Sequence, residues 1–298
     1  MMKISEITKL GKDLKLFDTF DCIGKGFPVF LPKGAIMIKK IQDEVENILM
    51  ENHYLPVKTP CISNFDIYKI EDRYQTERGR LFQVENTGEE KLYLKPYLSL
   101  FHCTIYNKEQ YSYKDLPIKF FETSSVFRNE KDIKGLIKTR QFTITDCSIF
   151  EAEKNLEQSL KEIVSIQNEI VNKLGLQVRY EVQNWDTDKK EEYIGTIDEW
   201  NMCIEKMENA LRDDNLAFTE NNKAPMYGPA IKLFYGDNYF AKIQIDFEIT
   251  HRFDVKFHNK ENKAEFPKFI HSTIVGSYEN LIGILIDKYQ GEFPEWLQ

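Results

Sequence analysis

Residues 120–150 read FFETSSVFRNEKDIKGLIKTRQFTITDCSIF, and this stretch decides the fold. Apolar and polar residues on both sides of a charged segment at 128–132 predict two strands joined by a loop. The first strand ends near Phe127 and the second begins near Lys138. Successive side chains of a strand point to opposite faces, so one face of the second strand carries Arg140, Phe142, Ile144, Asp146 and Ser148.

That face presents a cation, an aromatic ring, an apolar side chain, a carboxylate and a hydroxyl over roughly 26 Å, at about 3.3 Å per residue. Arg128 and Glu130 lie at the loop end of the same hairpin. A cation can bind phosphate, a carboxylate can accept an amine, and a ring can stack on a purine. The combination indicates a nucleotide site.

The hairpin resembles motif 2 of the class II aminoacyl-tRNA synthetases, which reads F-R-x-E, a loop, and R-x-F. Here these elements are Phe127-Arg128-Asn129-Glu130 and Arg140-Gln141-Phe142. The chain as a whole resembles the catalytic domain of threonyl-tRNA synthetases, and is identified as a divergent, stand-alone relative of it. The similarity continues through residues 24–32, 227–229, 244–247, 252–254 and 271–296.

This resemblance implies an α/β fold of the α+β type, with an antiparallel sheet flanked by helices. It also implies one catalytic domain over residues 1–298, with neither an editing nor an anticodon-binding domain. Residues 35–51 have helical apolar spacing and precede a strand at 54–60, as in motif 1, which builds the family's dimer interface. The spacing alone fits an ordinary core helix equally well; the resemblance favours a homodimer.

Further helices and strands are predicted from the spacing of apolar residues and from turn-forming residues between them. Helices are predicted at 96–106, 153–175, 197–212 and 277–289, and strands at 91–95, 176–182 and 240–249. Residues 66–83 are charged and irregular, with a turn at 77–80.

The composition fits a globular, cytoplasmic protein: 42% of residues are hydrophobic, 30% are charged, and no apolar run is long enough for a membrane span. Five scattered cysteines fit reduced thiols better than a disulfide framework. The 40 basic and 48 acidic residues give a net charge of −8. Because nucleic-acid binding depends on phosphate neutralisation, this acidic balance argues against tRNA as a partner of the chain on its own, although a local basic patch could still hold one RNA end.

The resemblance assigns roles to individual residues. Arg128 would contact the α-phosphate of ATP, which binds with Mg²⁺, and Lys138 and Arg140 would complete the catalytic cations. Glu130 would accept the adenine amine, Phe142 would stack on the ring, and Gln244 lies on the strand beneath. Asp146 would receive the ammonium group of a small amino acid, in a pocket lined by Tyr227.

Other positions depart from the family pattern. Motif 3 ends in Asn280 where the family has an arginine that clamps the γ-phosphate, and Lys138 also replaces an arginine. Arg73 aligns with a histidine that assists transfer to tRNA, and Ile144 replaces a polar substrate contact. The family's zinc ligands, one cysteine and two histidines, align with Ser99, Ser148 and His271. Serine is a poor zinc ligand, so no metal site is predicted.

Three functions remain open at this point. The chain is a threonyl-tRNA synthetase-like ATP-binding domain that activates a small amino acid without zinc, and this enzyme is the leading hypothesis. Alternatively, it is a non-catalytic paralogue acting as a regulatory or partner-binding module. In the third hypothesis it transfers an activated amino acid to a carrier protein or another non-tRNA acceptor.

Overall fold

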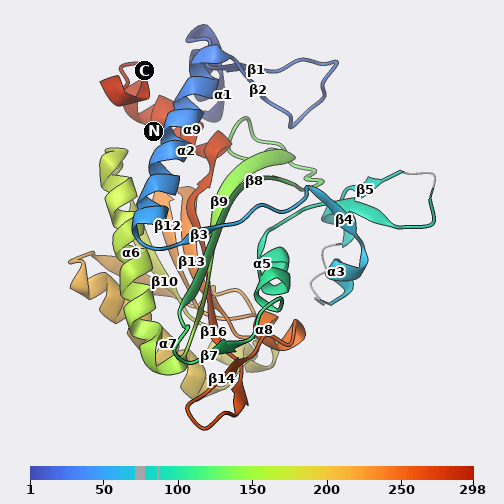
Figure 1. The fold of residues 1–298 in the computed structure, drawn as a ribbon. Helices are drawn as coiled ribbons and strands as arrows, with labels where there is room; N and C mark the ends of the chain where they lie inside the picture. Colours follow the sequence, from blue (N-terminus) through green and yellow to red (C-terminus); the bar gives the residue numbers. More distant parts are fainter. Residues whose placement is uncertain (71–77, 86–87) are drawn as a thin grey trace.

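The central hairpin forms as predicted in the computed structural model, which describes residues 1–70, 78–85 and 88–298 (Figure 1). Strand β8 (Ile118–Phe127) pairs antiparallel with β9 (Gln141–Glu151) along their whole length. The second strand begins at Gln141, later than predicted. The reason is that the Arg140 backbone N–H donates to Gly26 O, which takes this residue out of the regular ladder.

The hairpin lies in an eight-stranded sheet with the order β11-β10-β12-β13-β16-β9-β8-β3. Its interior pairs are antiparallel, whereas β11 with β10 and β3 with β8 form a parallel pair at each edge. The predicted α/β fold with an antiparallel sheet flanked by helices is therefore confirmed. The remaining strands are β3 (Leu55–Pro56), β10 (Arg179–Gln183), β11 (Phe218–Asn221), β12 (Ala230–Tyr235), β13 (Asn238–Asp246) and β16 (Lys268–Ser277).

One face of the sheet is covered by a layer of long helices (Figure 1). These are α1 (Ile4–Asp13), α2 (Pro32–Glu51), α6 (Leu156–Lys173), α7 (Ile197–Asp213) and α9 (Tyr278–Tyr289). The main core lies between them and the sheet, and includes Cys147, Ile149, Ile243, Ile245 and Ile270. None of the helices in the described ranges is long and apolar enough to cross a membrane.

The opposite face carries short elements and an aromatic second core (Figure 1). Helix α5 (Ser99–Tyr106) contacts β9, and α8 (Ile249–Arg252) contacts β16. Two small sheets complete this side: β4 (Ile62–Asn64), β6 (Leu92–Leu94) and β5 (Gln83–Val84), and β15 (Ala264–Glu265), β14 (Phe257–His258) and β7 (Tyr111–Ser112). Short pieces β1 (Phe17–Asp18), β2 (Val29–Phe30) and α3 (Asp66–Lys69) lie near the N-terminal third.

Several predicted boundaries are wrong. The strand predicted at 240–249 ends at Asp246, because its carboxylate accepts the N–H groups of Glu248 and Ile249 and starts α8. The strand predicted at 54–60 is paired only over Leu55–Pro56, and the helix predicted at 96–106 begins at Ser99. Strands β12 and β16 and helix α1 were not predicted. Residue 77 of the predicted turn, like Arg73, lies outside the described residues.

Packing of α2 against the N-terminal segment yields a stability prediction. A Cβ on Gly34 would lie 2.1 Å from Leu16 O, so we expect Gly34→Ala to cost about 1–3 kcal/mol. The matched control is Gly283→Ala in α9, where the nearest atom is 3.7 Å away and alanine should add about 0.5–1 kcal/mol. Urea unfolding of both variants measures the difference; equal effects would contradict this packing.

Candidate functional site

One face of β9 packs against the helical layer, and the other carries the candidate site. On the helical side, Thr145 is hydrogen-bonded to the Tyr278 hydroxyl at 2.7 Å, and Cys147 is buried in the main core. Phe142, Ile144, Asp146 and Ser148 therefore point to the other face, as predicted from the alternation. Burial raises the pKa of the Cys147 thiol, which lies on the opposite face of the strand from Ser148.

At the loop end of the hairpin, an arginine lies over an aromatic ring. The Arg128 guanidinium carbon is 5.1 Å from the centre of the Phe142 ring, and its Nε donates to Pro96 O at 3.1 Å. The backbone carbonyl thus helps to fix the guanidinium group above the ring. The two residues that the sequence analysis assigned to phosphate and adenine lie in direct contact.

Glu130 organises the remaining cations of this loop. Its carboxylate lies 2.6 Å from Arg80 Nη2 and 3.0 Å from Lys138 Nζ, and its backbone carbonyl accepts from Arg140 Nε at 3.0 Å. Burial raises the pKa of Glu130, but hydrogen bonds from Arg80 and Lys138 outweigh this and lower it. The structure therefore brings Lys138 and Arg140 together with Glu130. Arg80 is a member of this cluster that the sequence analysis missed.

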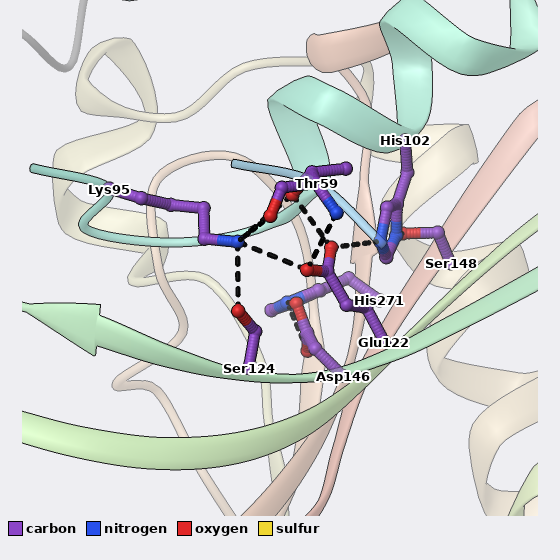
Figure 2. Close-up of polar contacts among 8 residues, drawn as sticks. All are labelled: Thr59, Lys95, His102, Glu122, Ser124, Asp146, Ser148 and His271. Carbon is purple, nitrogen blue, oxygen red and sulfur yellow. Dashed lines mark hydrogen bonds and ion pairs between the residues drawn. The ribbon is translucent and has the colours of Figure 1, made fainter. Parts of the chain in front are cut away.

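Asp146 lies at the centre of the face and is fully buried. Its carboxylate is 2.8 Å from His271 Nε2, and this histidine comes from β16, the strand next to β9 (Figure 2). Asp146 thus already has a polar partner in the structure. A ligand ammonium group would have to share the carboxylate with His271.

A buried polar network lies beside Asp146, where the family's zinc ligands align (Figure 2). Lys95 Nζ is 3.0 Å from Glu122 Oε1 and donates to Ser124 Oγ at 2.9 Å. Glu122 also accepts the N–H and the hydroxyl of Thr59. Burial raises the pKa of Glu122, but neighbouring His102, Thr59 and Lys95 outweigh it and lower the value to about 2. The Glu122 carboxylate is thus retained in its charged form inside the protein.

His102 joins this network and was missed by the sequence analysis. It is fully buried, its Nδ1 is 2.8 Å from Ser148 Oγ, and its Nε2 is 3.6 Å from Glu122 Oε2. Within the described residues no hydrogen bond joins Ser99 to Ser148 or His271. His102 follows Ser99 by three residues on α5, and this spacing puts both on one side of a helix. That spacing was the available signal.

No group of three or more His, Cys, Asp or Glu side chains in the described ranges could hold a metal ion. Of the three positions aligned with zinc ligands in the sequence analysis, Ser148 lies 2.8 Å from His102 Nδ1 and His271 lies 2.8 Å from Asp146. The hydrogen bonds of Ser148 with His102 and of His271 with Asp146 offset part of the cost of burying these polar groups.

The other assigned residues lie on neighbouring segments. Gln244, on β13, pairs with His271 in the sheet register, and its Oε1 accepts from Lys242 Nζ at 2.7 Å. Tyr227 lies in the preceding loop, where its carbonyl accepts from Phe247 N–H at 2.9 Å. Gln244 therefore lies on β13 directly opposite His271, and Tyr227 is attached to the chain just after the end of β13.

Asn280 is buried at the start of α9. Its Nδ2 donates to Tyr239 O at 2.9 Å, and its backbone N–H donates to Ser277 Oγ, which caps the helix. The neighbouring Glu279 accepts the Thr143 N–H through both carboxylate oxygens. The segment that aligns with motif 3 is thus attached to β13 and β9 by neutral and backbone hydrogen bonds.

The eight-stranded sheet, with Arg128 lying over Phe142 at the loop end of its central hairpin, is the core of a class II aminoacyl-tRNA synthetase. Residues 82–289 match the model of the tRNA synthetase class II core domain (G, H, P, S and T), and the chain belongs to this family.

Among its members, threonine–tRNA ligases match almost the whole chain. The relative from Clostridium botulinum is 35% identical over 302 residues, covering 97% of this chain and 47% of the relative. The one from Flavobacterium psychrophilum is 32% identical, with 97% and 46% covered. The chain spans about half the length of these relatives. The resemblance to the threonyl-tRNA synthetase catalytic domain is confirmed.

Solved structures show the same fold. A threonyl-tRNA synthetase RNA-binding domain from Cryptosporidium parvum aligns with a TM-score of 0.90 at 24% identity, covering 98% of this chain and 74% of that one. A putative threonyl-tRNA synthetase from Aeropyrum pernix gives 0.86 at 21% identity, with 97% and 70% covered.

The buried pair of Lys95 and Glu122 yields a second prediction. Lys95→Met leaves the Glu122 charge buried without its cation, and we expect a loss of about 3–5 kcal/mol. Adding Glu122→Gln should restore part of this loss, because the unpaired charge is removed. Lys138→Met is the control: its ion pair is half-exposed, and its loss should cost under about 1 kcal/mol. Urea unfolding of these three variants and the wild type measures the losses, and a Lys95→Met variant as stable as the control would contradict the network.

Glu279 yields a pH prediction. Burial raises its pKa to about 7, despite the hydrogen bonds from Thr143 that favour the charged form. Because an unfolded-chain glutamate titrates near 4.3, the folded protein holds the extra proton between the two values. This contribution to stability is complete below about pH 4 and is lost as the pH rises through 7.

We therefore expect the wild type to lose roughly 2–3 kcal/mol more than Glu279→Gln between pH 5 and pH 8. Denaturant unfolding at the two pH values measures the difference. Parallel pH profiles for the two proteins would refute a neutral, buried Glu279.

Proposed function

We propose that this chain binds ATP with Mg²⁺ and activates a small amino acid as its adenylate, without zinc. The contact between Arg128 and Phe142, on the same face as Asp146, carries the proposal. The ring supplies a stacking surface, and the guanidinium supplies a phosphate donor close to the carboxylate that would hold the amino group. Adenylate formation requires mainly positioning and charge neutralisation, which these groups can provide.

The amino-acid pocket would select its substrate by hydrogen bonding instead of metal coordination. Ser148 and His271, which align with two of the family's zinc ligands, are hydrogen-bonded to His102 and to Asp146. Fixed hydrogen-bonding groups can reject substrates that leave them unpaired. We propose that threonylation through zinc is replaced by recognition of a small amino acid by these side chains.

A homodimer through α2 and β3 is part of the proposal. Apolar side chains remain exposed there: Ile36 is 52%, Met50 44% and Leu55 54% exposed. Such residues favour association when they lie close together on one surface.

A second candidate function is a non-catalytic binding module. It is favoured by Asn280, whose amide is buried and bonded to Tyr239 O where the family has a phosphate-binding arginine. Loss of one preorganised cation costs roughly 10²–10³ in rate. In this alternative Arg128 still contributes to nucleotide binding, but pyrophosphate release does not occur.

The experiment is ATP–pyrophosphate exchange over the twenty amino acids, with and without a zinc chelator. We expect exchange with a small amino acid, unaffected by the chelator, and a fall of 10²–10³-fold in Arg128→Ala. Arg212→Ala is the matched control, since Arg212 lies over Phe218 at 5.4 Å on a different part of the surface.

Exchange that is equal in both variants would show that Arg128 has no role in the reaction. If no amino acid supports exchange, titration of ATP separates the remaining possibilities. Binding that Arg128→Ala abolishes favours the binding module, and no binding excludes both functions.

A further inference from the structure

A small pocket lies on the other face of β9 from the candidate site. Its volume is about 220 Å³. Gln141, the first residue of β9, lines this pocket, and the alternation of the strand places Gln141 on the face of Thr145 and away from Phe142. The pocket is therefore separate from the contact of Arg128 with Phe142. Its lining residues are Ile23, Phe27, Pro28, Val29, Gln141 and Glu279.

One wall of the pocket is a buried carboxyl group. Glu279, in the first turn of α9, is only 7% exposed, and its two oxygens accept the Thr143 N–H at 3.1 and 2.9 Å. Its hydrogen bonds come from uncharged groups of Thr143 and of its own backbone, and it forms no ion pair with the residues that the structure describes. A carboxylate offers about four acceptor positions, so Glu279 can accept further donors from the pocket.

The remaining wall is mostly apolar. It comes from residues 23–29, where Ile23 is 49% exposed and Phe27 and Val29 are half-buried. A molecule that covered these side chains would remove apolar surface from water, which is favourable. The pocket thus combines an apolar surface with a single carboxyl group that has no positive partner.

The segment that forms the apolar wall is held in place on both sides of Phe27. The Arg140 backbone N–H donates to Gly26 O at 2.9 Å, and Val29 pairs with Asp18 between β2 and β1. Gly26 has a φ of 85°, and a Cβ there would lie 3.0 Å from Arg140 Cγ, so glycine permits this close approach. The wall is therefore formed before any ligand binds, which lowers the entropic cost of binding.

We propose that this pocket binds a small organic cation, an apolar body that carries one ammonium or amidinium group, with the cation at Glu279. The lining residues include none of those assigned to ATP or to the amino acid, so the site is independent of the proposed function. A cavity of about 150 Å³ can hold benzene. The volume of about 220 Å³ therefore accommodates a six-membered ring with a short amine arm.

The charge of the ligand follows from the surroundings of Glu279. An anion would be repelled by the carboxylate, and a wholly apolar molecule would leave the carboxyl group without a donor on the pocket side. A cation supplies the compensation that the protein does not. Burial raises the pKa of Glu279 to about 7, and a bound cation would lower it again by favouring the charged form.

The experiment is calorimetric titration of the full 298-residue chain with benzylamine and with benzyl alcohol, which has the same ring but no charge. The buffer is at pH 8, where Glu279 is mostly ionised. Variants are Glu279→Gln, which keeps an acceptor for the Thr143 N–H, and Ile23→Ser. Their controls are Glu292→Gln, at an exposed position beyond the end of α9, and Ile197→Ser, whose side chain is 48% exposed.

We expect benzylamine to bind the wild type and both controls alike. Glu279→Gln should bind it roughly 10–100-fold more weakly, because a hydrogen bond between two charged groups is lost. Ile23→Ser should weaken binding about three- to tenfold through lost apolar contact. Benzyl alcohol should bind the wild type more weakly than benzylamine, and Glu279→Gln should not reduce its affinity further.

A second measurement uses the proton of Glu279. Near pH 6 the bound cation should displace this proton, so the heat of benzylamine binding should depend on the ionisation enthalpy of the buffer in the wild type and not in Glu279→Gln. Equal benzylamine affinity in the wild type and Glu279→Gln overturns the proposal. Absence of saturable benzylamine binding to the wild type also overturns it. Because Ile23 is half-exposed, Ile23→Ser tests the apolar wall without disturbing the core.

Discussion

The strict alternation of β9 is the constraint on which the molecule depends. Because neighbouring residues point to opposite faces, each residue of the strand belongs either to the core or to the site. Thr145 and Cys147 attach the strand to the helical layer, while Phe142, Asp146 and Ser148 remain on the other side. A shift of one residue would exchange these two sets. The hydrogen bond between Thr145 and Tyr278 and the surrounding apolar core therefore also fix the orientation of the site.

Much of this was predictable from the sequence. The alternation of residues 140–148 gave the face of the strand, and the motif in residues 127–142 gave the family and singled out Arg128 and Phe142, though not the contact between them. Boundaries were less predictable, because capping contacts such as that of Asp246 depend on tertiary structure.

The parts of the site that were missed come from non-local contacts. His102 lies in a mostly apolar helix, and its hydrogen bond is made with Ser148, 46 residues away in the sequence. Glu122 had no assigned role in the sequence, and it lies directly opposite Asp146 only through the register of β8 with β9. The interactions of a charged side chain in this sheet depend on the residues opposite it on the neighbouring strands.

The network around Glu122 has a consequence for the evolution of this pocket. Its members come from the segments around Thr59, Lys95 and Ser124, so it joins separate parts of the chain as well as lining the site. A buried ion pair cannot lose one partner without leaving an uncompensated charge inside the protein. Substitutions in this network are therefore expected to lower the stability of the fold as well as to change the polar surroundings of Asp146. An evolutionary change at these positions would have to be accompanied by compensating substitutions elsewhere in the core.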